Sequence, residues 1–412
     1  MWKSAERDSL CCFISVVDSP PEPGSGPLSG LVFGVKDNID VEGFTTTLGS
    51  LLGDPLPQAE SAEVVRSVED LGAVCLGKQN LGELATDAYT MNPHFGTTLN
   101  PWDTKRIVGG SSGGSAAAIA AGIVDFAFGS DSGGSVRIPA SMCGIAAFRP
   151  SQSARWQKGL VGGAWSIDSI GLMGPTLSDL HWLVRQAHLL PLSSSGSSEP
   201  LRVGVVMDGS MGAVRSDVAD VFDVAVRRLK EDPRLRIEKL RLGGLELGVL
   251  VAAVIAYVDL GAQHADTIRS QPQKYGAPAR HIFRIGNLFS GTDYVTAGRM
   301  RQLIIDRYLE AASGFDLVVT PTLPVTAPVI GEDPVVPGDD SQLGLFSLIR
   351  FTALANLTGV PSASIPIGLS DDGLPVGLQV MGHRHRDMRM LAAAEIIEEA
   401  VGQHLLPPIY TG

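Results

Sequence analysis

Short apolar runs alternate with segments of helical spacing along most of the chain, and this alternation limits the possible folds most strongly. The run LVFGVK at 31–36 is typical of a strand, and the Asp-Asn pair after it marks its end. At 61–72 apolar residues recur at helical spacing, and the short run AVCLG follows. The same alternation recurs at 116–129, 145–149, 202–207, 217–230, 316–322, 362–368 and 375–382. This pattern predicts an α/β protein.

Low-complexity segments indicate how the chain is divided. The Pro-, Gly- and Ser-rich stretch at 19–30 predicts that 1–30 forms a tail or a short strand, and that 31–412 forms a single domain. A second such stretch, LPLSSSGSSEP at 190–200, is typical of an exposed linker or loop. The longest apolar run, 247–258, is too short for a bilayer, which needs about 20 residues. It is a candidate core helix.

Composition excludes several classes of partner. A net charge of −12 and the absence of a basic run disfavour binding to nucleic acid. The four cysteines show neither a C-x-x-C pair nor the spacing of a disulfide framework, and the N-terminus lacks an export signal. We therefore expect a cytoplasmic protein that contacts no membrane and exists as a monomer or homodimer.

Small residues concentrate in two segments, GGSSGGSAAA at 109–118 and GSDSGGSVRIPAS at 129–141. Glycine density of this kind allows the backbone to approach a ligand closely. Either segment alone is more often a tight turn, but the two together indicate loops that face a ligand.

Other motif matches have simpler explanations. The segment 72–78 matches the start of a phosphate-binding loop, but Gln79 replaces the required Ser or Thr. The match of 110–114 to a nucleophile elbow lacks a buried strand before it. His383 and His385 stand among arginines without a metal-binding partner, which favours a solvated loop.

Several longer motifs resemble those of the amidase signature family: GVKDNID (34–40), NLGELAT (80–86), 100–118, 129–151, 165–180, 316–328 and 356–382. The resemblance extends from about residue 31 to 400, with a variable, substrate-shaping region at about 185–310. It implies a mixed, twisted central sheet covered by helices on both faces.

The resemblance also implies a catalytic set of Ser135 as nucleophile, Ser111 after a cis peptide bond, and Lys36 as base. A serine hydroxyl is a weak nucleophile until a base removes its proton, and lysine can act as that base only when neutral. Burial of Lys36 at a strand end would favour the neutral form. Ser111 would relay the proton between Lys36 and Ser135.

Neighbouring residues receive supporting roles. The backbone N–H groups of Ser132, Gly133, Gly134 and Ser135 are the expected oxyanion hole. We expect support for the loops from the set Gly110, Ser112, Asp131 and Arg137, the last two as a structural ion pair. The acyl pocket is expected to include Met91, Phe95, Trp165 and parts of 255–300. No metal or organic cofactor is expected.

These observations predict hydrolysis of a small carboxylic amide to the acid and ammonia through a seryl acyl-enzyme. Lys36 lies early in the chain, and in this respect the sequence resembles short members of the family that are similar to plant indole-3-acetamide hydrolase. Two alternatives remain: an amidotransferase A-type subunit that releases ammonia for a partner, and an inactive binding protein of the same fold.

Overall fold

One mixed sheet of eleven strands crosses the protein in a computed structural model that describes residues 9–17, 19, 24–53, 55–191, 199–206, 212–243, 245, 247–332 and 344–408. The strand order is β1-β3-β2-β6-β8-β7-β12-β13-β11-β9-β10. The strands are β1 (Phe13–Val16), β2 (Val32–Lys36), β3 (Val74–Gln79), β6 (Phe126–Ser130), β7 (Ala146–Arg149), β8 (Ile170–Gly174), β9 (Leu201–Val206), β10 (Leu235–Leu240), β11 (Leu317–Pro321), β12 (Ser362–Leu369) and β13 (Pro375–Met381). A separate two-stranded sheet pairs β4 (Met91–Asn92) with β5 (Gly96–Thr97).

The large sheet has two groups of parallel strands, with a block of antiparallel strands between them. Strands β3, β2 and β6 run parallel to one another, as do β11, β9 and β10 at the other end. Between them, β8, β7, β12 and β13 pair antiparallel. Parallel β2 and β6 end at the same edge of the sheet, and their last residues, Lys36 and Ser130, are therefore neighbours.

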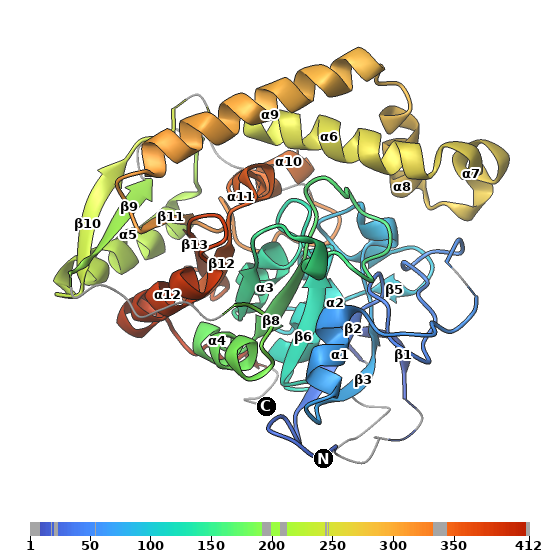
Figure 1. Ribbon diagram of the computed structural model, residues 1–412, viewed down its shortest axis with the longest axis horizontal. Helices are drawn as coiled ribbons and strands as arrows, with labels where there is room; N and C mark the ends of the chain where they lie inside the picture. Colours follow the sequence, from blue (N-terminus) through green and yellow to red (C-terminus); the bar gives the residue numbers. More distant parts are fainter. Residues whose placement is uncertain are drawn as a thin grey trace.

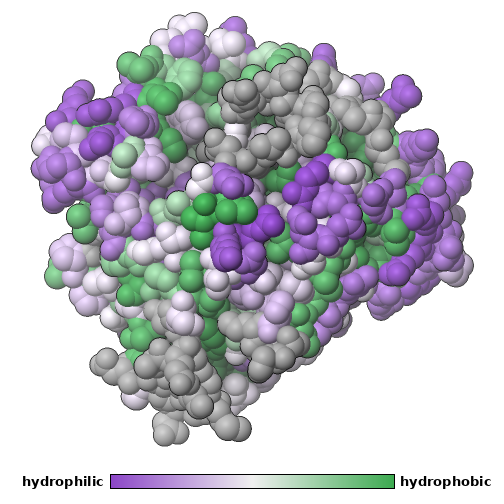
Figure 2. Space-filling view, turned by 180° about the vertical axis from the view of Figure 1, so that it is seen from behind, coloured by the Kyte–Doolittle hydropathy of each residue, from purple (hydrophilic) through white to green (hydrophobic). Residues whose placement is uncertain are grey.

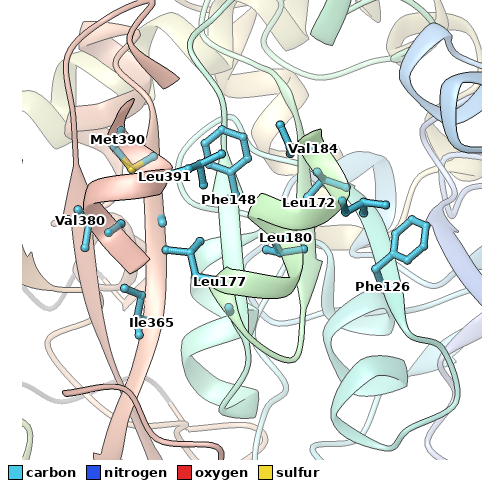
Figure 3. Packing of buried hydrophobic residues seen from close by; sticks show 14 of the residues in the cluster. Phe126, Phe148, Leu172, Leu177, Leu180, Val184, Ile365, Val380, Met390 and Leu391 are labelled. Carbon is cyan, nitrogen blue, oxygen red and sulfur yellow. The ribbon is translucent and has the colours of Figure 1, made fainter. Parts of the chain in front are cut away.

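Helices cover both faces of this sheet (Figure 1). A large apolar core lies between one face and α1 (Glu63–Glu69), α4 (Leu177–Gln186), α5 (Ser216–Glu231) and α12 (Asp387–Val401). Figure 3 shows side chains of α4 and α12 packed against Phe148, Leu172 and Val380 of the sheet. The opposite face packs against α2 (Gly113–Ala120) and α3 (Arg137–Cys143).

A helical layer lies beyond the second face. It contains α6 (Gly248–Gln263), α7 (Ala265–Ser270), α8 (Ala277–Gly286), α9 (Gly291–Ala312), α10 (Gly344–Ile349) and α11 (Ala353–Thr358). Helix α6 lies beside α9 and contacts α8, α10 and α11 (Figure 1). We call α6–α10 the cap.

The predicted architecture is confirmed: an α/β fold with a mixed sheet and helices on both faces. The strands expected at 31–36, 73–77, 202–207, 316–322, 362–368 and 375–382 are all present within a residue or two. Residues before Leu31 contribute β1, which pairs antiparallel with β3. The linker proposed at 190–200 lies mostly outside the described residues.

The surface is mixed in polarity. On the face seen in Figure 2, hydrophilic residues are interspersed with small groups of hydrophobic ones. In the part of the chain that the structure describes, no helix has both the length and the apolar character needed to span a membrane.

Candidate active site

Lys36 is the last residue of β2 and is fully buried between β3 and β6. Its Nζ lies 2.8 Å from Ser111 Oγ and 2.9 Å from Ser130 Oγ. Asn38 donates from Nδ2 to the same Ser130 oxygen at 3.1 Å. The lysine nitrogen is therefore held in place by two hydroxyl groups from different loops.

Ser111 lies in the loop between Gly109 and α2, and the Gly110–Ser111 peptide bond is cis, as the resemblance predicts. Thr90 holds this loop: its hydroxyl donates to the Gly109 carbonyl at 2.8 Å and accepts from Gly113 N at 3.1 Å. A Cβ on Gly110 would lie 2.8 Å from Thr90 Oγ1, closer than real Cβ atoms come to a neighbour. The glycine here therefore reflects close packing of the loop.

Ser135 lies in the second glycine-rich loop, directly against the first. Ser112 connects the two loops, because its N–H donates to the Ser135 carbonyl at 3.2 Å and its hydroxyl donates to the Ser130 carbonyl at 3.2 Å. Within the described residues, the Ser135 hydroxyl has no hydrogen-bond partner. Ser135 lines a cavity, and its oxygen is available to a bound molecule.

Asp131 and Arg137 form a fully buried, bidentate ion pair beneath this loop, with N···O distances of 2.7 and 3.0 Å. Arg137 also donates to Gln379 Oε1 at 2.6 Å and to Asn356 Oδ1 at 2.7 Å. Burial alone would raise the pKa of Asp131, but Arg137 and then Arg149 outweigh it and hold that pKa at about 2. The pair fixes the nucleophile loop from below.

Three of the four expected oxyanion-hole donors are available. In the described structure, the N–H groups of Ser132, Gly133 and Ser135 have no acceptor, and all three residues line the cavity. The N–H of Gly134 is different, because it donates to Asp131 Oδ1 at 2.8 Å. The prediction for Gly134 is therefore wrong: this donor is used to position the loop.

Gly134 is needed for its conformation instead. Its φ is +128°, and a Cβ there would lie 2.3 Å from Thr352 Oγ1. Thr352 in turn donates its hydroxyl to the Gly133 carbonyl. A side chain at Gly134 would displace this contact.

The electrostatics of the site favour a neutral lysine. Burial lowers the pKa of Lys36 to about 8, against the opposing effect of Asp168, Asp131 and Asp87. Burial also raises the pKa of Asp168 to about 6, although Lys36 opposes this. Asp168 is 1% exposed, and a hydrogen bond with the Ser132 side chain lowers its pKa against the effect of burial. Lys36 and Asp168 each have the strongest charge interaction with the other.

The cavity beside Ser135 opens to solvent, and the empty space in and above it amounts to about 680 Å³. Its remaining walls come from 85–88, from 163–167 and from the cap. The cap residues are Ala252, Ala253, Ala256, Tyr257 and Leu260 of α6 and Phe346 and Ile349 of α10. The prediction that parts of 255–300 contribute to the pocket thus corresponds to the second half of α6.

The three side chains predicted for the acyl pocket do not line this cavity. Trp165 is 66% exposed, Met91 is exposed in β4, and Phe95 is half-buried next to Cys11, whose Sγ donates to its carbonyl. The prediction placed the acyl pocket in variable segments of the sequence, and sequence alone does not show which side chains of such segments face Ser135. His94 binds Glu83 at 2.8 Å and is likewise absent from the cavity lining.

Sequence reasoning also missed several residues of the site. Ser130 precedes Asp131 in the recognised motif, so its hydroxyl could have been noted. Thr90 and Thr352 lie outside the recognised motifs, whereas Asn356 and Gln379 lie in the motif at 356–382 without a feature that marks them as part of the site. Over the described part of the chain, no cluster of three or more His, Cys, Asp or Glu is arranged to hold a metal ion.

Comparison with known proteins agrees with this geometry. A family model described as Amidase matches residues 18–391, and the chain therefore belongs to the amidase family, as its motifs predict. The A subunit of the glutamyl-tRNA(Gln) amidotransferase of Exiguobacterium sibiricum is 32% identical over 422 residues, which cover 93% of this chain and 87% of that protein.

Solved structures show the same fold. The crystal structure of the glutamyl-tRNA(Gln) amidotransferase A subunit from Thermotoga maritima superposes with a TM-score of 0.84 at 30% identity, covering 98% of this chain and 92% of that one. A crystal structure described as an amidase gives a TM-score of 0.86 at 28% identity, with 96% and 94% covered. The resemblance to short indole-3-acetamide hydrolases stays a prediction.

Proposed function

We propose that the protein hydrolyses a small carboxylic amide to the carboxylic acid and ammonia, with Ser135 as nucleophile and Lys36 as base. The observation that carries this proposal is the 2.8 Å contact between the buried Lys36 Nζ and Ser111 Oγ, beside an unpartnered Ser135. A lysine with a lowered pKa can accept a proton near neutral pH, which an exposed lysine cannot.

The first step transfers the Ser135 proton to Ser111 while Ser111 gives its own proton to neutral Lys36. The Ser135 oxygen forms a bond to the amide carbon, and the carbonyl oxygen becomes an oxyanion. The N–H groups of Ser132, Gly133 and Ser135 are placed to donate to that oxyanion.

Collapse of the tetrahedral intermediate breaks the C–N bond. Lys36 returns its proton through Ser111 to the leaving nitrogen, which departs as ammonia and leaves an acyl-Ser135. Water then attacks the ester by the same proton relay and releases the acid. The cycle regenerates neutral Lys36 and the Ser135 hydroxyl, so no cofactor enters the balance.

Labelling with a fluorophosphonate tests the nucleophile. We expect the reagent to modify Ser135, as mapped by mass spectrometry, and Ser135→Ala to abolish both labelling and ammonia release while the protein stays folded. Ser115→Ala is the matched control, because this buried hydroxyl on α2 has no hydrogen-bond partner in the described structure. A label on Ser112 or Ser115 would contradict the assignment.

The identity with amidotransferase subunits supports a second candidate, release of ammonia from glutamine for a partner. In that case, the isolated protein would release no ammonia from simple amides. Glutamine-dependent release would appear only after addition of amidotransferase partner subunits. We also propose a cytoplasmic location and a single catalytic domain over 31–412, in line with the sequence analysis.

A further inference from the structure

Three small side chains of one helix line the cavity. Ala252, Ala253 and Ala256 of α6 all line it, and Leu260 follows one turn later. Because alanine ends at Cβ, these positions leave open space where larger residues would fill the cavity. The sequence of α6 therefore determines how large an acyl group can lie next to Ser135.

Aromatic rings close the same side of the cavity. Tyr257 of α6 and Phe346 of α10 lie with ring centroids 6.4 Å apart and planes inclined by 55°. Both residues line the cavity, and neither is fully buried. Such rings favour contact with an apolar chain or another ring.

The charges around the cavity are one-sided. Asp87 is the single charged residue in its described lining, which includes no Lys or Arg. Asp168 lies just behind Gly163, since a Cβ on that glycine would meet Asp168 Oδ2 at 2.1 Å. The buried cation Arg137 is paired with Asp131 and does not line the cavity, so it offers no site for an anion. A substrate carboxylate would thus lie near Asp87, with Asp168 behind the wall, and would find no Lys or Arg in the described lining.

We propose that this pocket accepts amides with an uncharged, apolar acyl group and rejects acyl groups that carry a carboxylate. This inference rests on the proposed hydrolysis at Ser135 and specifies its substrate class. It also separates the protein from a glutaminase, because glutamine carries both a carboxylate and an ammonium group.

A matched pair of substrates tests whether the pocket rejects an acyl group that carries a carboxylate. Hexanamide and 5-carbamoylpentanoate have the same six-carbon acyl chain and differ in a terminal methyl or carboxylate. We expect kcat/KM for hexanamide to exceed that for the acid by at least about 100-fold, because the substrate carboxylate would be placed near like charges with no cation to pair with it. Glutamine should be hydrolysed no better than the acid.

The outcomes separate this inference from the proposed function. If fluorophosphonate labels Ser135 but the acid or glutamine is hydrolysed as well as hexanamide, the substrate class is wrong and the nucleophile stands. Labelling of Ser135 with turnover of none of these three amides would also overturn the substrate class. Failure to label Ser135, with no turnover, would instead overturn the proposed function.

A larger side chain on α6 tests whether this helix limits the size of the acyl group. Ala256→Leu fills space at a half-buried position of the lining, and we expect kcat/KM for hexanamide to fall by about tenfold or more relative to acetamide. Ala262→Leu, an exposed position on the same helix, should leave the hexanamide to acetamide ratio unchanged. Equal losses for both amides in Ala256→Leu, with the fold intact, would show that α6 does not bound the acyl group.

Discussion

Lys36 at the end of β2 and the two glycine-rich loops with Ser111 and Ser135 are largely buried and joined by side-chain hydrogen bonds. The cap, by contrast, faces the same cavity with alanines and two aromatic rings. In the loops, the polar side chains are linked by successive hydrogen bonds. We therefore expect a change at one residue to displace several atoms of the site. In the cap, α6 could change the side chains that face the cavity without breaking a hydrogen bond of the loops. We therefore expect the first region to determine the chemistry and the cap to determine the choice of substrate.

The largest effect expected from this difference is at Lys36. We predict that Lys36→Ala and Lys36→Arg both lower kcat by about 10²–10⁴-fold, because neither residue can accept the relayed proton. Lys36 is neutral only above its pKa, so kcat/KM of the wild type should rise with pH through about 8. Rates measured from pH 5 to 10 would show this rise, which we call the acidic limb of the pH profile.

His94→Ala is the control for that prediction. His94 contacts Glu83, outside the cavity lining, and the limb should stay in place when it is removed. Substantial activity in Lys36→Arg, or loss of the limb in His94→Ala, would exclude Lys36 as the base.

The two regions also differ in how well the sequence predicted them. The Lys36 strand and both glycine-rich loops lie in continuous motifs, and strand-end geometry brings Lys36 and Ser130 together. The ion pair of Arg137 with Asp131 was predicted, but its contacts with Asn356 and Gln379 were not, because these residues lie 219 and 242 positions away and a motif does not show which distant residues meet in the fold.

The cap was less predictable for a different reason. The apolar run at 247–258 correctly indicated a helix, and part of α6 packs in a hydrophobic core. Nothing in an alanine shows whether it faces a core or a cavity, since both need a small apolar side chain. The acyl wall was therefore sought in larger residues, such as Trp165, that are exposed instead.

A second prediction concerns stability. Arg137→Met would leave the fully buried Asp131 without its bidentate partner, and we expect the free energy of unfolding to fall by about 3–5 kcal/mol. Urea unfolding followed by circular dichroism would measure this loss. In the cap, Arg269→Met removes an exposed ion pair with Asp266 on α7, and the unfolding midpoint should not move measurably. A similar loss of unfolding free energy in both variants would show that the ion pair beneath the Ser135 loop contributes no more to stability than an exposed ion pair of the cap.

A glycine-to-alanine pair should give effects of opposite sign. At Gly134, the positive φ and the contact with Thr352 predict destabilisation by about 1–3 kcal/mol, with loss of activity as the donor N–H groups move. At Gly298, exposed within α9 and with no atom within 4 Å of a new Cβ, alanine should stabilise by about 0.5–1 kcal/mol. Thermal or urea unfolding of both variants would test the signs. A stable, active Gly134→Ala would mean that the loop tolerates a side chain.

The smallest expected effect is a shift in pH dependence at Asp168. Its negative charge raises the pKa of Lys36, against the lowering by burial, and Asp168 is the strongest of the three carboxylates that do so. Asp168→Asn removes this charge but can keep the 2.8 Å bond that Oδ1 accepts from Ser169 N. The pKa of Lys36 should then fall, and the acidic limb of kcat/KM should move to lower pH.

A downward shift of one unit would raise the neutral fraction of Lys36 well below the limb by about tenfold. Asp87→Asn should move the limb in the same direction but less, because Asp87 has the weakest effect of the three on Lys36. A merely structural role for Asp168 would lower kcat at every pH without moving the limb. An unmoved limb, or one displaced to higher pH, would show that Asp168 does not control the charge of Lys36.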